Sequence, residues 1–96
     1  MIIGFRSKAA EDIYHGHASK DARSIPRDVW KTAQRKLDYL DGAAGLSDLR
    51  IPPGNRLEAL KGNLDGKHSI RINDQYRIIF RYRDGNAHEV EIIDYH

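Results

Sequence analysis

The last three residues of the sequence, Asp94, Tyr95 and His96, place a carboxylate, a phenol and an imidazole directly after a strand-like run. Histidine titrates near pH ~6.5 and is the usual proton donor at neutral pH. Glutamate side chains are ionised there, so Glu58 is a candidate base, whereas lysines such as Lys61 are mostly protonated. With an arginine to hold the phosphate, an acid and a base can cleave RNA through its own 2′-hydroxyl group. The alternative is a solvated chain end without chemistry.

Arginines for such a site are concentrated in one segment, although the net charge is only +2 and the pI about 9.0. Four of them lie between residues 71 and 83: Arg71, Arg77, Arg81 and Arg83. Guanidinium groups match phosphate geometry, so this segment is a candidate anion-binding surface. Alternatively, these arginines pair with Glu89 and Glu91 of the following strand. The sequence leaves both interpretations open.

The residue types give little support for metal binding, nucleotide binding, or thiol or serine catalysis. The sequence has no cysteine, which excludes disulfides, thiol catalysis and cysteine-ligated zinc. Its five histidines are scattered, and the only close pair, His15 and His17, matches no zinc motif. No glycine-rich nucleotide-binding loop or serine-hydrolase motif is present. We therefore expect neither a metal nor a cofactor.

Hydrophobic periodicity indicates the elements that must position these residues. Residues 2–6 are predicted to form a short strand, and residues 8–17 a helix capped by Ser7. A second helix is predicted from Pro26 to the glycines at 42 and 45. Its apolar side chains recur every three or four residues and are expected in the core: Trp30, Ala33, Leu37, Leu40 and Ala44.

After a proline-rich loop the apolar period changes to two. Strands are predicted at residues 56–61, 67–73, 76–83 and 87–96, joined by short turns. The layout predicts an α+β domain over residues 1–96, with two helices packed on one face of an antiparallel sheet.

Alternation along these strands divides their side chains between two faces. The apolar set is expected under the helices: Ile70, Ile72, Tyr76, Ile78, Phe80, Tyr82, Val90 and Ile92. The opposite face is then expected to be open and to display Arg71, Arg77 and Arg81 with Tyr95. Guanidinium groups beside an aromatic ring are suited to bind RNA phosphates and stack bases.

Composition indicates a globular protein without a membrane segment. It is 40% hydrophobic and 31% charged, and no apolar run approaches the roughly 20 residues that span a bilayer. The first residues lack the apolar core of a secretory signal. Together with the lack of cysteine, this predicts a cytoplasmic protein.

The sequence resembles the HigB toxins of the RelE/ParE superfamily, the toxic halves of bacterial type II toxin–antitoxin pairs. The resemblance covers essentially the whole chain and is densest in PPGNRLEALKGNLDGKHSIRINDQYRIIFRYRDG and the closing EVEIIDYH. It implies a RelE-like fold and a ribosome-dependent endoribonuclease that cleaves mRNA in the A site without metal.

The resemblance also implies residue roles. The family's closing carboxylate, phenol and imidazole correspond to Asp94, Tyr95 and His96. Its lysine in LKG corresponds to Lys61, and its sheet arginine to Arg77.

One departure concerns the general base. Some relatives carry a histidine three residues before Lys61, where this chain has Glu58, and other RelE-fold toxins use a glutamate base. The base therefore stays open between Glu58 and Lys61. A second basic position of the family corresponds to Asn73, with Arg71 two residues away as a substitute.

The implied partners are a HigA-type helix-turn-helix antitoxin, the 70S ribosome and mRNA, with operator DNA bound only through the antitoxin. The resemblance favours antitoxin docking away from the active site. Two alternatives on the same fold are a non-catalytic inhibitor of the ribosome or gyrase, and a decayed toxin that only binds antitoxin.

Overall fold

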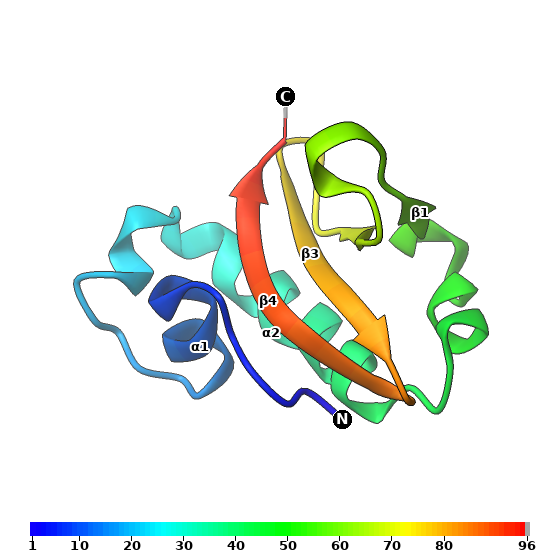
Figure 1. The fold of residues 1–96 in the computed structure, drawn as a ribbon. Coiled ribbons are helices and arrows are strands. Elements are labelled where there is room, and N and C mark those ends of the chain that lie inside the picture. Colours follow the sequence, from blue (N-terminus) through cyan, green and yellow to red (C-terminus); the bar gives the residue numbers. More distant parts are fainter. Residues whose placement is uncertain (96) are drawn as a thin grey trace.

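A four-stranded antiparallel sheet and two helices make up the fold in the computed structural model, which describes residues 1–95 (Figure 1). The helices are α1 (Lys8–Tyr14) and α2 (Arg27–Gly42), and the strands are β1 (Glu58–Ala59), β2 (His68–Arg71), β3 (Tyr76–Arg83) and β4 (Asn86–Asp94). Each strand pairs with the next along the chain, in the order β1-β2-β3-β4. Single 3-10 turns lie in the connections: η1 (Ala22–Ser24), η2 (Leu46–Arg50), η3 (Pro53–Asn55) and η4 (Gly62–Leu64). The predicted α+β class and antiparallel meander are confirmed.

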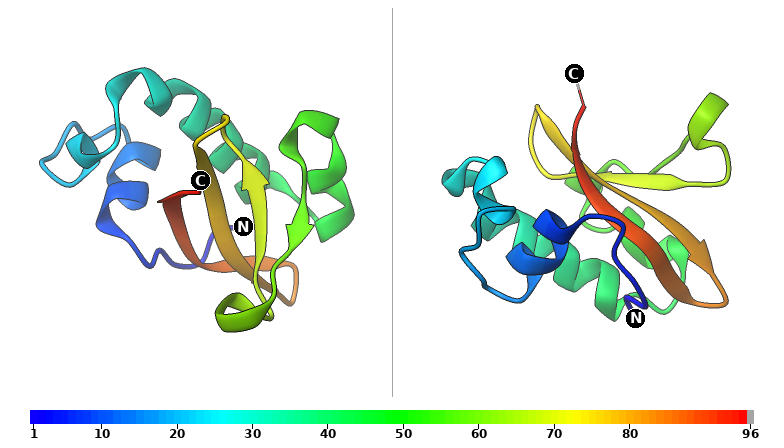
Figure 2. Two further views of the ribbon diagram at one scale, coloured as in Figure 1. Left: turned by 90° about the horizontal axis from the view of Figure 1, so that it is seen from above. Right: turned by 60° about the vertical axis from the view of Figure 1, so that its left-hand side comes forward.

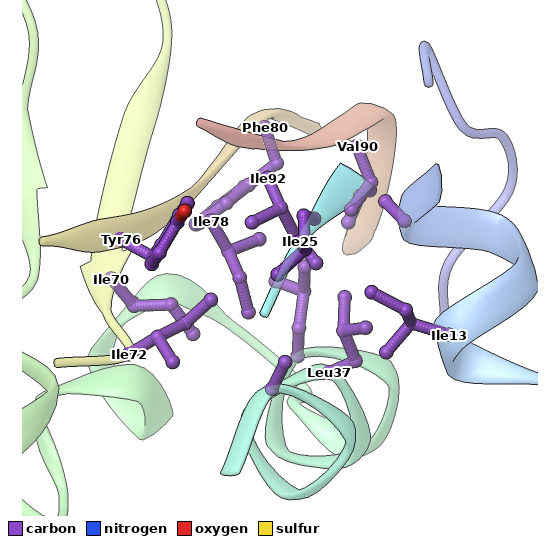
Figure 3. Packing of buried hydrophobic residues seen from close by; sticks show 14 of the residues in the cluster. Ile13, Ile25, Leu37, Ile70, Ile72, Tyr76, Ile78, Phe80, Val90 and Ile92 are labelled. Atoms are coloured by element: carbon purple, nitrogen blue, oxygen red, sulfur yellow. The ribbon is translucent and has the colours of Figure 1, made fainter. Parts of the chain in front are cut away.

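The helices cover one face of the sheet, as predicted. Helix α2 crosses behind β3 and β4, and α1 packs against α2 and β4 (Figures 1 and 2). The core forms where the apolar stripe of α2 meets the inward side chains of the strands (Figure 3). Fully buried members from both layers are Leu37, Leu40, Ile70, Ile78, Phe80 and Val90. Removing each of these side chains from water contributes roughly 1.5–3 kcal/mol.

The helix ends differ slightly from the prediction. Ser7 caps α1 as expected, since its Oγ accepts a hydrogen bond from the backbone N–H of Ala10 at 3.2 Å. Pro26 is the residue before α2 rather than its first residue. Because α2 ends at Gly42, Ala44 is exposed, and Ala43 is buried in its place.

The predicted strand at residues 2–6 is not regular. The segment runs parallel beside β4 and forms two isolated bridges, Ile2 with Ala87 and Phe5 with Val90 (Figure 2, right). The register of β4 against β3 shifts between Ile79 and Arg81, and Glu89 has φ 53°. This bulge lets both Ala87 and Val90 face the core, whereas uninterrupted alternation puts them on opposite faces.

No helix within residues 1–95 is both long and apolar enough to cross a bilayer.

Asp12 is a buried carboxylate that the periodicity of α1 did not reveal. Ser19 donates a hydrogen bond to its Oδ2 at 2.6 Å, and Lys8 donates one to Oδ1 at 3.3 Å. The Ser19 hydrogen bond lowers the pKa of Asp12 below its ordinary 3.8; burial opposes this, and the charges of Lys8 and His17 assist it. The ionised carboxylate thus ties α1 to the connector that follows it.

We expect Asp12→Asn to lower the melting temperature at neutral pH and to lose this effect in acid. The pKa of Asp12 is lower in the folded than in the unfolded chain, so its stabilisation is present above about pH 3.8 and disappears as the pH falls through the folded-state value. Thermal melts of both proteins between neutral pH and about pH 2 measure this, with the exposed neighbour substitution Glu11→Gln as control. A pH-independent difference between wild type and Asp12→Asn would contradict the assignment.

Candidate active site

Arg77 lies at the centre of the candidate site, on the face of the sheet opposite α2. Its Nε donates a hydrogen bond to Ser69 Oγ at 2.9 Å, and its Nη2 donates one to the backbone carbonyl of Arg56 at 2.6 Å. Only 7% of the residue is exposed. The guanidinium plane is therefore fixed by two protein acceptors.

The prediction of an open arginine face is wrong at this position. Ile79 of the same face is also buried, as are Leu60 and Lys67, and the two apolar residues lie outside the main core cluster. The segment from Arg56 to Lys67 carries β1, which pairs with β2 at the edge of the sheet, and its Arg56 carbonyl and Glu58 carboxylate contact the Arg77 side chain. Burial of Leu60 and Ile79 is favourable, because it removes apolar side chains from water.

Glu58 and Tyr95 flank Arg77. Glu58 Oε1 lies 3.6 Å from Arg77 Nη1, and the guanidinium carbon lies 5.4 Å from the centre of the Tyr95 ring, in a cation–π contact. The Glu58 side chain is 50% exposed and Tyr95 is 41% exposed. The buried cation thus has a carboxylate and a phenol beside it that are open to solvent.

The structure places the two other sequence-predicted catalytic residues that it describes further out. Asp94 is exposed at the end of β4, and its Oδ2 accepts a hydrogen bond from Gln75 Nε2 at 3.0 Å. Lys61 is exposed immediately before η4, and within residues 1–95 its side chain makes no hydrogen bond or ion pair with Arg77, Glu58 or Tyr95. The predicted catalytic residue His96 lies outside the described residues.

The predicted RNA-binding residues Arg71 and Asn73 interact within the hairpin between β2 and β3. Arg71 forms an ion pair with Asp74. The side-chain oxygen of Asn73 accepts hydrogen bonds from the backbone N–H groups of Gln75, at 2.9 Å, and Tyr76, at 2.7 Å. Asn73 therefore stabilises the turn that orients Arg77 at the start of β3.

Arg81 pairs with one acidic residue of β4, Glu89, as in the alternative considered from the sequence. Its Nε lies 3.2 Å from Glu89 Oε2. The buried Lys67 ammonium lies 3.7 Å from Glu89 and 3.9 Å from Glu91. Burial raises the pKa of Glu89, but the Arg81 hydrogen bond and the charges of Lys67, Arg81 and Arg6 outweigh it and lower the pKa overall. Arg81 thus pairs with an acidic side chain, whereas Arg77 belongs to the candidate site.

Ser69 and the Arg56 carbonyl are the parts of the site that sequence reasoning missed. Alternation puts Ser69 opposite Ile70, on the face of Arg71 and Arg77, so the sequence does carry a signal for it. Arg56 adopts a left-handed conformation with φ 45°, which is uncommon for a residue other than glycine and has no sequence signature.

The side chains around Arg77 can bind a phosphate group directly and polarise it. Arg77 supplies a fixed positive charge, Glu58 a nearby carboxylate, and Tyr95 a ring that can stack on a base. Within residues 1–95, no group of three or more histidine, aspartate or glutamate side chains is arranged to hold a metal ion.

Comparison with known proteins shows which family and which solved structures this chain is similar to. Residues 4–96 match the family described as RelE-like toxin of type II toxin-antitoxin system HigB. Toxin HigB-1 of Vibrio cholerae serotype O1 is 49% identical over 87 residues, covering 91% of this chain and 90% of that protein. An uncharacterised protein of Haemophilus influenzae is 35% identical over 79 residues, covering 81% of this chain and 78% of that protein. Among solved structures, YoeB–YefM toxin–antitoxin from Staphylococcus aureus is similar in fold, with a TM-score of 0.61, 21% identity, and coverage of 100% and 98% of the two chains.

Proposed function

Because the chain belongs to the HigB family of RelE-like toxins of type II toxin–antitoxin systems, we propose that it is an endoribonuclease that cleaves mRNA in the ribosomal A site. The observation that carries the proposal is the Arg77 cluster. A guanidinium fixed by Ser69 and Arg56 lies next to a solvent-open carboxylate and a solvent-open phenol. A fixed cation and a nearby base are two of the groups that metal-independent cleavage of RNA requires, and we propose His96 as the third, the acid.

In the proposed reaction the RNA supplies its own nucleophile. A base, Glu58 or Lys61, takes the proton of the 2′-hydroxyl, and the 2′-oxygen attacks the adjacent phosphorus. The bond to the 5′-oxygen breaks, and an acid protonates that oxygen; His96 is assigned this role by the family resemblance. The products are a 2′,3′-cyclic phosphate and a 5′-hydroxyl. Arg77 stabilises the negative charge that builds on the phosphate oxygens in the transition state.

The remaining assigned residues support substrate binding in this proposal. Tyr95 stacks against a base of the message, and Asp94 stands next to it at the end of β4. Arg71, paired with an exposed aspartate, exchanges that partner for an RNA phosphate. Asn73 is already hydrogen-bonded within its turn, and Arg81 is already paired with Glu89. Their contribution to RNA binding is therefore smaller in this proposal.

The proposal includes the partners that the family implies. An antitoxin neutralises the toxin, and we assign it to the HigA type with a helix-turn-helix DNA-binding unit. Operator DNA is then bound through the antitoxin, and the ribosomal target places the toxin in the cytoplasm.

Primer extension on a translated message tests the proposal. We expect cuts within translated codons soon after expression without antitoxin, and we expect the cuts to require translation. His96→Ala is the matched variant, and it should lose the cuts and the growth arrest. Growth arrest without cuts would instead support a non-catalytic inhibitor, and a folded protein that is harmless would indicate a decayed toxin.

A further inference from the structure

Lys36 of α2 is a buried cation for which the proposed chemistry has no direct use. Only 7% of the residue is exposed. Its ammonium donates a hydrogen bond to the side-chain oxygen of Asn55 and lies 5.6 Å from the centre of the Tyr39 ring. In the described part of the chain it forms no ion pair with a carboxylate. Burial lowers the pKa of Lys36, and the nearby charges of Arg35 and Arg71 lower it further.

Asn55 links this lysine to the loop that precedes β1. Its side chain is fully buried, and its amide nitrogen donates to the carbonyl oxygens of Leu49 at 3.1 Å and Ile51 at 3.4 Å. The backbone N–H of Asn55 donates to the Pro52 carbonyl at 2.9 Å. A single asparagine thus joins α2 to both 3-10 turns of the loop.

The loop in turn positions Arg77. The residue after Asn55 is Arg56, whose left-handed backbone directs its carbonyl oxygen to Arg77 Nη2 at 2.6 Å. Two residues further, Glu58 lies beside Arg77 Nη1. A left-handed conformation is unfavourable for a residue with a side chain, so surrounding contacts must hold it. The backbone N–H of Arg56 donates a hydrogen bond to the Pro53 carbonyl at 3.1 Å, and the side-chain contacts of Asn55 hold the residue immediately before it.

We propose that Lys36 and Asn55 are positioning residues that act through Arg56 to hold the guanidinium of Arg77 in the orientation that the phosphate requires. The inference rests on the proposed function for the role of Arg77, but not for the contacts. Stability alone gives no reason for the lysine, because burying a charge without a carboxylate partner is unfavourable and an aliphatic side chain avoids that cost. The lysine is explained if it holds the loop before β1 at a defined distance from α2.

Lys36→Met tests the inference in the full-length protein. We expect the single-turnover rate of mRNA cleavage on ribosomes to fall about 10–100-fold, with little change in the toxin concentration that gives half the maximal rate. The NMR signals of the Arg77 Nη–H groups should shift or broaden, because the Arg56 carbonyl that accepts from Nη2 is no longer fixed. In an Arg77→Ala background, Lys36→Met should have little further effect on the rate, as expected for a residue that acts through another.

Two further variants keep the test decisive. Val29→Ala truncates a buried side chain in the first turn of the same helix, so it is the control for a general loss of stability. Asn55→Asp keeps an oxygen for Lys36 but removes the amide donors to Leu49 and Ile51, so the same NMR change should appear even if Lys36→Met does not fold. A normal Arg77 signal in the folded Lys36 or Asn55 variants, with a melting temperature lowered as in Val29→Ala, would overturn the inference. Full activity of Arg77→Ala would instead overturn the proposed function, and the NMR result would still decide the positioning role.

Discussion

Arg77→Ala is expected to lower the rate of mRNA cleavage by roughly 10²–10⁴-fold and to relieve growth arrest. The residue is only 7% exposed and its guanidinium is already oriented by Ser69 and Arg56, so little reorganisation is needed when phosphate charge develops. A preoriented cation in a partly desolvated site stabilises such charge far more than a mobile one in water. Arg77→Lys should recover little of the rate, because one ammonium cannot hold the two acceptors and the phosphate in the same plane.

Single-turnover cleavage on programmed ribosomes measures the effect, with circular dichroism to establish that the variant folds. Its melting temperature should fall, because Ser69 Oγ and the Arg56 carbonyl lose their shared donor. Arg83→Ala is the matched control: it lies on β3 and on the same side by alternation, but it is exposed at the strand end. A rate near that of wild type for Arg83→Ala and a large loss for Arg77→Ala are expected. Equal rates in both variants would remove Arg77 from the site.

The fold was largely predictable because alternation and helical periodicity report burial directly. The observed β3, Tyr76–Arg83, has the predicted limits, and the apolar stripe around Leu37 lies in the core. Alternation also placed Arg77 and Ser69 on one face, and the structure joins them by a hydrogen bond. What periodicity cannot report is which segment covers the second face of a sheet.

The misses come from tertiary contacts and backbone irregularities, which periodicity does not report. Ile79 alternates with Arg77 and Arg81 on one face of β3, and its burial on that face is not reported by alternation. The bulge at Glu89 shifts the alternation of β4 by one residue and leaves no signature in the sequence. The buried charges of Asp12 and Lys36 were equally invisible, because a polar residue between apolar ones is expected at the surface.

Glu58→Gln is expected to lower the maximal cleavage rate by roughly 10²–10⁴-fold, and Lys61→Met to lower it much less. Glu58 Oε1 lies 3.6 Å from Arg77 Nη1, so a phosphate bound by Arg77 brings its adjacent 2′-hydroxyl near this carboxylate. Lys61 has no comparable contact among the described residues. Glutamine keeps the size of the side chain and its capacity to accept a hydrogen bond, but it removes the basic oxygen.

The same substitution should strengthen RNA binding, which distinguishes a lost base from a damaged site. In the free protein Glu58 competes with phosphate for Arg77, and a half-exposed ion pair of this kind is worth only about 0–1 kcal/mol. Glu58→Gln removes the competitor, so the concentration for half-maximal rate should fall while the maximal rate collapses. If Lys61→Met instead abolishes cleavage while Glu58→Gln cleaves at the wild-type rate, the base is Lys61, and the carboxylate beside Arg77 serves only to hold the free site together.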